Sequence, residues 1–144
     1  DGGYKVVMTR NNDTYISLDE RVNYAVKQGA DIFISIHVNS YTGNSANGTE
    51  SYYYNGGNHA TESKQLATII QKRLVNELDT TNRGVKTNTY RVLKTNTIPA
   101  TLVELAFITN SEDAKKLGSA TYRDKAAHAL YLGVIDYDNW DGNN

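Results

Sequence analysis

The sequence predicts one α/β domain in which a mostly parallel, twisted sheet carries helices on both faces. Two observations favour this fold class. Apolar segments of strand length alternate along the chain with longer segments in which apolar residues recur at helical spacing. The two most apolar strand segments, residues 31–37 and 99–107, lack the alternation of a half-solvated sheet, which indicates burial on both faces.

The first part of the chain predicts a strand, a helix and a second strand. Residues 4–9 (YKVVMT) are rich in β-branched side chains, which favours a short strand. Ser17 and Glu20 have the spacing of a capping box that opens a helix, and Gly29 is a residue type that commonly ends one. Residues 31–37 follow at once as an apolar strand. A helix between two strands at this spacing predicts parallel pairing.

The same alternation continues to the end of the chain. Turn-forming residues separate the later segments, and helical spacing of apolar residues identifies the long helices. In chain order we expect a loop over residues 41–48, a strand over 49–54, a turn over 55–58, a helix over 61–78, a loop over 80–88, a short strand over 90–93, a buried strand over 99–107, a short helix capped by Asn110 or Ser111, and a last helix over 121–137.

Composition excludes several classes of function. The 144 residues suit one domain with its own core, and the formal net charge of −1 favours neither nucleic acid nor an anionic membrane surface. Because the chain has no cysteine, disulfides and thiolate metal sites are excluded, and any metal must be held by His, Asp or Glu. No apolar run approaches the length of a membrane span. The start Asp-Gly-Gly, without an initiator Met, leads us to expect a processed or truncated N-terminus.

Each of the two apolar strands carries one polar residue that packing does not explain. His37 stands at the carboxyl end of the first strand, where ligands gather in parallel sheets. It is a metal ligand or catalytic residue, a buried histidine satisfied by the backbone, or a plain residue at the end of a strand. Glu104 lies within LVELAF, where an unpaired carboxylate costs roughly several kcal/mol. It is either tuned as a general base or acid, or it forms an ion pair with Arg10 or Lys94.

A histidine and a glutamate together suggest metal-assisted hydrolysis, in which Zn²⁺ activates water and a carboxylate takes its proton. One histidine is not a complete site, because catalytic zinc normally has three protein ligands. His59 and His128 lack ligand spacing to His37, and we expect both to be solvated. Glu50 is a weaker candidate, since a carboxylate on a strand face is its simpler account. The 11 tyrosines suit sugar or peptide contact, but ordinary strand faces also explain them.

Five stretches carry a family resemblance. The two longest are residues 30–39 (ADIFISIHVN) and 99–110 (PATLVELAFITN), and the shorter ones are residues 6–10 (VVMTR), 18–23 (LDERVN) and 48–53 (GTESYY). In this order, and over nearly the whole chain, they resemble the zinc-dependent N-acetylmuramoyl-L-alanine amidases of the amidase_3 family, which are peptidoglycan hydrolases. Ala106 stands where the family usually has Gly.

The resemblance implies a mechanism and a substrate. His37 would be a zinc ligand, Ser35 and Asn39 would shape its surroundings, and Glu104 would be the catalytic carboxylate that activates zinc-bound water. The bond cut would be the amide between the lactyl group of N-acetylmuramic acid and L-alanine of the stem peptide, with Zn²⁺ polarising the carbonyl. Peptidoglycan would be the partner, which implies an autolysin-like enzyme that is secreted or held in the cell envelope.

One departure from the family limits this interpretation. In the family, a first strand with a Gly-His-Gly-Gly-type motif and the helix after it bring a ligand His and a ligand Glu, and no stretch of this chain matches them. We therefore expect residues 1–144 to be an amidase_3-like catalytic domain that lacks its first strand and helix, and with them two of three zinc ligands. Two alternatives stay open: a non-catalytic wall-binding or structural remnant of an amidase, or a site that a partner chain completes.

Overall fold

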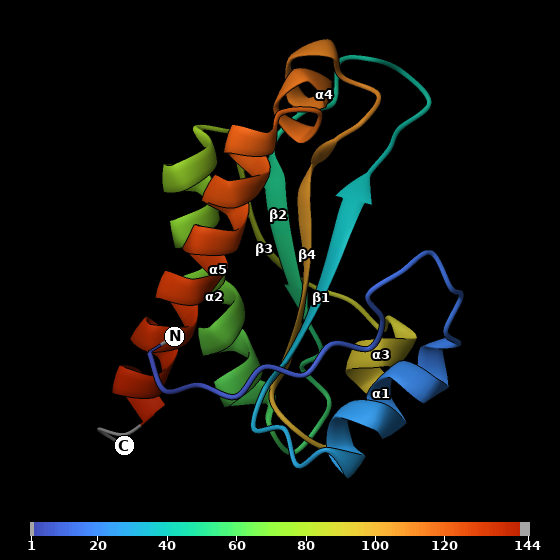
Figure 1. Ribbon diagram of the computed structural model, residues 1–144, viewed down its shortest axis with the longest axis vertical. Helices are drawn as coiled ribbons and strands as arrows, with labels where there is room; N and C mark the ends of the chain where they lie inside the picture. The colour runs from blue at the N-terminus through green and yellow to red at the C-terminus, as the bar shows by residue number, and fades with distance from the viewer. Residues whose placement is uncertain (1, 142–144) are drawn as a thin grey trace.

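A four-stranded sheet forms the centre of the computed structural model, which describes residues 2–141 (Figure 1). Its strands are β1 (Phe33–Asn39), β2 (Thr49–Tyr53), β3 (Asn82–Thr87) and β4 (Ala100–Phe107), in the order β1-β4-β2-β3. β1 is parallel to β4 and β2 is parallel to β3, whereas β2 and β4 are antiparallel. The sheet therefore consists of two parallel pairs that point in opposite directions.

Helices cover both faces of this sheet. α2 (Ala60–Leu78) and α5 (Ala120–Asp141) lie on one face, α1 (Leu18–Lys27) and α3 (Arg91–Lys94) lie on the other, and α4 (Ser111–Leu117) follows β4 (Figure 1). The core beneath α2 and α5 includes Leu66, Ile70, Val103 and Ala129, and the core beneath α1 and α3 includes Val22, Phe33, Val92 and Leu102. The α/β fold class predicted from the sequence is confirmed.

Two helices begin as the sequence predicts. The Ser17 side chain accepts a hydrogen bond from the Glu20 N–H at 3.3 Å, and the Ser17 N–H donates to the Glu20 carboxylate at 3.1 Å, which completes the capping box of α1. At the start of α4, the Asn110 side chain accepts the N–H groups of Glu112 and Asp113. The cap of α4 is thus Asn110 and not Ser111.

A buried carboxylate joins α4 to two strands. Asp113 accepts the backbone N–H of Phe107, at the end of β4, at 2.9 Å. It also accepts the N–H of Gly48, just before β2, at 2.8 Å. Because hydrogen bonds to charged acceptors are the strong ones, Asp113 holds the end of β4 and the start of β2 together at one end of this antiparallel pair.

The strand predicted over residues 4–9 is wrong. This segment is irregular, it pairs with no strand among residues 2–141, and Val6 is 76% exposed. A strand is stable only when a neighbour completes its backbone hydrogen bonds and covers one of its faces. The β-branched composition of the segment is therefore not sufficient to make a strand.

Two other predicted elements are also wrong, and each has a physical reason. The loop expected over residues 80–88 contains β3, which has no apolar stripe that would mark it as a strand. Its Arg83 and Lys86 instead form ion pairs with Glu50 on β2. The strand expected over residues 90–93 is the helix α3, in which Val92 and Leu93 are both buried. Adjacent residues of a strand point to opposite faces, whereas a helix can turn both toward one core.

Replacement of Gly48 tests how tightly the start of β2 is held. Gly48 has a φ of 109°, and a Cβ there would lie 2.3 Å from the carbonyl oxygen of Thr81. Since both the backbone conformation and the contact oppose a side chain, we expect Gly48→Ala to lower the free energy of unfolding by about 2–3 kcal/mol. Urea unfolding followed by circular dichroism measures this change.

Gly43→Ala is the matched control, because a Cβ at Gly43 would meet nothing within 4 Å. Its free energy of unfolding should stay within about 0.5 kcal/mol of the parent value. Equal stability of the two variants would contradict the close approach of Gly48 to Thr81.

Candidate catalytic site

Three of the residues considered from the sequence lie in a row across the sheet. His37 on β1 is the register partner of Glu104 on β4, and Glu104 is the register partner of Glu50 on β2. Such partners point to the same face and lie about 5 Å apart. The face is the one that carries α1 and α3, because Phe33 and Leu102, at even spacing along the same strands, pack in that core. The row lies near the carboxyl ends of β1 and β4.

The surroundings of His37 fix the position of its ring and favour its neutral form. Its Nε2 lies 2.8 Å from the hydroxyl oxygen of Ser35, two residues earlier on the same face. Burial lowers the pKa of the His37 imidazole, and the positive charge of Arg21 lowers it further. The neutral ring is therefore favoured, and a neutral ring nitrogen is the form that binds a metal.

Glu104 is a carboxylate without compensation. Its Oε2 is buried, and within residues 2–141 it has no hydrogen-bond partner. The ion pair with Arg10 or Lys94 that the sequence left open does not form, and Arg10 instead donates to the carbonyl oxygen of Thr14 at 3.0 Å. Burial raises the pKa of Glu104 to about 7, and the negative charge of Glu50 contributes in the same direction.

Glu50 is the opposite case, although it is more deeply buried than Glu104. Its Oε1 accepts hydrogen bonds from Asn39 at 2.9 Å and from the Tyr52 hydroxyl at 2.7 Å. Its Oε2 accepts from Arg83 Nε at 3.1 Å and from Lys86 Nζ at 2.5 Å. Burial acts to raise the pKa of Glu50, but the hydrogen bonds from Lys86, Tyr52 and Arg83 outweigh it and lower the pKa to about 2.

Two neighbouring carboxylates thus have very different proton affinities. Glu50 stays ionised at neutral pH, whereas Glu104 exchanges its proton close to neutral pH. A pair of acidic groups whose environments separate their pKa values is the arrangement that assigns acid–base work to one of them. The geometry therefore favours Glu104 as the group that moves a proton, and Glu50 as a fixed charge.

Sequence reasoning missed the hydrogen-bond partners of Glu50. The sequence points to Asn39 only through the family resemblance, and Arg83 and Lys86 lie in a segment that the sequence predicts to be a loop. The signal that could have found them is their type and spacing, because two cations three residues apart in a polar stretch suit a buried carboxylate on a neighbouring strand. The pairing of β2 with β3, and the register between them, is needed to see that Glu50 is that carboxylate.

The other two histidines lie apart from the row. His59 precedes α2 and lies 4.0 Å from Glu62, and His128 on α5 lies 3.7 Å from Glu77. Their side chains are 44% and 57% exposed. Neither approaches His37, so the prediction that both are solvated is confirmed.

The described residues do not complete a zinc site. Between residues 2 and 141 there is no group of three or more His, Cys, Asp or Glu side chains that could hold a metal ion. His37 has the chemistry of one ligand, and the unpartnered oxygen of Glu104 has the chemistry of a base beside it. Glu50 is not available as a ligand, since four hydrogen bonds already occupy its oxygens.

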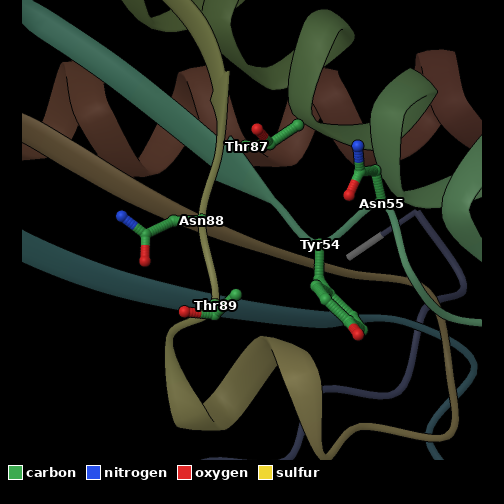
Figure 2. Close-up of a pocket in the computed structure, with 5 residues that line it drawn as sticks. All are labelled: Tyr54, Asn55, Thr87, Asn88 and Thr89. Atoms are coloured by element: carbon green, nitrogen blue, oxygen red, sulfur yellow. The ribbon is translucent and has the colours of Figure 1, made fainter.

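A hollow of about 300 Å³ lies at the carboxyl ends of the other parallel pair, β2 and β3. Figure 2 shows Tyr54 and Asn55 on one side of it and Thr87, Asn88 and Thr89 on the other. None of these five side chains is charged at neutral pH. The hollow therefore offers no acid–base pair, and the row of His37 and Glu104 is the candidate catalytic site.

Comparison with known proteins identifies the family. Residues 1–136 match the family Amidase_3, which is described as N-acetylmuramoyl-L-alanine amidase. The chain belongs to this family. The resemblance seen in the sequence motifs is thereby confirmed, and the match includes both His37 and Glu104.

Individual members of Amidase_3 are similar in sequence and in structure. N-acetylmuramoyl-L-alanine amidase LytC of Bacillus subtilis (strain 168) is 49% identical over 131 residues, which are 91% of this chain and 26% of LytC. N-acetylmuramoyl-L-alanine amidase AmiA of Escherichia coli (strain K12) is 30% identical, over 98% of this chain and 63% of AmiA. The crystal structure of N-acetylmuramoyl-L-alanine amidase from Clostridium difficile 630 superposes with a TM-score of 0.88 at 35% identity, over 94% of this chain and 72% of that chain.

The environment of Glu104 predicts how stability depends on pH. Because its pKa is raised to about 7 in the folded protein, the folded state binds this proton more tightly than the unfolded chain does. The stability contributed by the proton is complete below the unfolded pKa of about 4.5 and is lost as the pH rises toward 7. Glu104→Gln should therefore be increasingly stable relative to the parent protein as the pH rises from 4.5 to 7.

Urea unfolding at a series of pH values measures this difference. Glu112→Gln is the control, since the Glu112 side chain is 76% exposed and pairs only with Lys115. A parent-minus-variant difference for Glu104→Gln that stays constant between pH 4 and pH 8 would show that Glu104 is not held in a raised-pKa environment.

Proposed function

We propose that this domain hydrolyses the amide bond between N-acetylmuramic acid and L-alanine of the peptidoglycan stem peptide. The observation that carries the proposal is Glu104, a half-buried carboxylate whose buried Oε2 has no partner among residues 2–141, beside a neutral histidine near the ends of two parallel strands. Family membership supports this substrate, because the relatives LytC and AmiA are N-acetylmuramoyl-L-alanine amidases.

Glu104 acts as the general base and then as the general acid. The ionised carboxylate accepts a proton from a water molecule while the oxygen of that water bonds to the amide carbonyl carbon. The protonated Glu104 then donates the same proton to the amide nitrogen as the carbon–nitrogen bond breaks. The products are a carboxylic acid on the lactyl group and a free amino group on L-alanine. A pKa of about 7 suits both directions of transfer at neutral pH.

His37 would hold a zinc ion together with ligands that lie outside residues 2–141. Zinc, when bound, would polarise the scissile carbonyl and stabilise its developing negative charge. The contribution of the described residues is to keep the His37 ring neutral and to fix it against Ser35. Since no residue between 2 and 141 forms a hydrogen bond with the other ring nitrogen, His37 would hold the ion through Nδ1 while Ser35 occupies Nε2.

We also propose that residues 1–144 are one catalytic domain that a further strand and helix complete. Two features of β1 support this: it is an edge strand of the sheet, and Ile36 and Val38 on it are 54% and 49% exposed. An apolar edge strand is normally paired or covered. The alternative of a non-catalytic remnant leaves the buried, unpartnered Oε2 of the half-buried Glu104 unexplained, because a purely structural role would favour an apolar residue at this position.

The proposed substrate places the working protein outside the cell membrane, as a secreted or envelope-bound autolysin of the cell wall. The relatives are consistent with this place of action, since several are named as cell wall amidases. None of the helices formed within residues 2–141 has the length and hydrophobicity that crossing a bilayer requires.

Replacement of the proposed base tests the mechanism. In the protein that carries this domain, Glu104→Gln should lower kcat for release of stem peptides from purified cell walls by about 100- to 10,000-fold, because Gln cannot accept the proton of water. Chromatography of the released peptides measures the rate. Glu112→Gln should retain the parent rate, and full activity of Glu104→Gln would overturn the proposed role.

A further inference from the structure

The far end of the catalytic row carries more positive than negative charge. Arg83 and Lys86 on β3 both contact Glu50, at 3.1 Å and 2.5 Å. The Glu50 side chain is only 4% exposed, whereas the side chains of Arg83 and Lys86 are 34% and 43% exposed. One buried anion thus anchors two cations that remain accessible from outside, and the cluster keeps one positive charge in excess.

Both cations also keep hydrogen-bonding capacity. Arg83 uses Nε for Glu50 and Nη1 for a long contact of 3.5 Å with the Asn47 carbonyl oxygen, and its Nη2 donates to no partner in the part of the chain that is described. The guanidinium lies 4.8 Å from the ring centre of Phe107, which fixes its plane. Lys86 uses one of its three N–H donors for Glu50. The cluster is therefore a preformed site for an anion and is not saturated by Glu50.

The position of this cluster relative to Glu104 determines how many residues of a bound peptide lie between them. The sheet order β4-β2-β3 puts β3 two strands from Glu104 on the same row. Neighbouring strands lie about 4.8 Å apart, so the backbones of β4 and β3 are separated by roughly 10 Å, and this is an upper limit for the cationic groups because both reach back to Glu50 on β2. An extended peptide rises about 3.5 Å per residue, which makes this distance equal to two or three residues.

We propose that Arg83 and Lys86 bind a carboxylate on the peptide side of the substrate, about two residues beyond the amide bond that is cut. The inference rests on the proposed function and adds the orientation of the substrate: the stem peptide runs from Glu104 across β2 toward β3, and the sugar lies on the side of β1. On the sugar side, the carboxyl group of the lactyl substituent is consumed in the scissile amide, so the charged groups of the substrate belong to the peptide. A guanidinium and an ammonium together match a carboxylate in charge and in hydrogen bonding.

Two synthetic N-acetylmuramoyl tripeptides test the proposal. In both probes the second residue is joined to the third through its side-chain carboxyl group. They differ in one group only, because the α-carboxyl group of this second residue is a free carboxylate in one and a neutral carboxamide in the other. Calorimetry with the Glu104→Gln protein, which leaves the probes uncut, measures the two dissociation constants. We expect the carboxylate probe to bind about tenfold more tightly than the amide probe, as charge-assisted hydrogen bonds require.

Variants of the cation cluster locate the source of that preference. Lys86→Met and Arg83→Met should each reduce the preference for the carboxylate probe at least about threefold while leaving affinity for the amide probe nearly unchanged. Lys86→Arg keeps the charge and should keep the preference, which a purely structural role of Lys86 would not require. Lys64→Met is the matched control, since Lys64 is an exposed lysine on α2, on the opposite face of the sheet.

Each outcome decides the proposal. Equal affinity of the two probes, or a preference that survives both Lys86→Met and Arg83→Met, would overturn it. If Arg83→Met fails to fold because Glu50 loses a partner, the comparison of Lys86→Met with Lys86→Arg still decides. Because binding is measured without turnover, failure of the proposed amidase reaction would appear separately, as intact probes after incubation with the unaltered protein.

Discussion

The site depends on two carboxylates that face each other on neighbouring strands: Glu50 is buried, and Glu104 is half-buried with its Oε2 shielded from water. Glu104 and Glu50 are register partners, so two negative charges side by side would repel each other strongly at low local dielectric. The protein resolves this conflict unequally, because two cations and two neutral hydrogen-bond donors contact Glu50, whereas the buried oxygen of Glu104 has no partner among residues 2–141. Glu50 stays ionised, and Glu104 is left as the group that holds or releases a proton near neutral pH.

The antiparallel pairing of β2 with β4 is what brings these groups together. Glu50 is the second residue of β2, and Glu104 lies past the middle of β4. If β2 were parallel to β4, its second residue would lie near the start of β4, beside the core under α1 and α3. Because β3 is parallel to β2, its own early residue Arg83 also lies at this end of the sheet. The antiparallel arrangement of the two strand pairs thus brings Glu104, Glu50 and the cations that contact Glu50 together at one end of the sheet.

The row also has a chemical direction. At the β1 end, His37 is a neutral ring suited to a metal, in the middle Glu104 can move a proton, and at the β3 end Arg83 and Lys86 carry excess positive charge. A substrate with a neutral sugar on one side of an amide and a charged peptide on the other matches this direction. Electrostatic complementarity of this kind fixes orientation more than it adds affinity. The proposed reaction needs such orientation, because Glu104 must reach both water and the leaving nitrogen.

The sequence by itself determined the fold class, the start of α1, the start of α4 to within one residue, the presence of the two apolar strands, and His37 and Glu104 as polar residues out of place in them. These conclusions rest on local patterns, since capping, periodicity and apolar runs are read within a few residues. The full burial expected of the first strand is wrong, because β1 is an edge strand with Ile36 and Val38 exposed. Only the tertiary structure decided that residues 4–9 are irregular, that residues 82–87 form a strand, and that Glu50 is the buried partner of Arg83, Lys86 and Asn39. The physical reason is the same in each case: a strand and an ion pair are completed by residues far away in the chain, and which residues meet is set by strand order and register, which no local pattern contains.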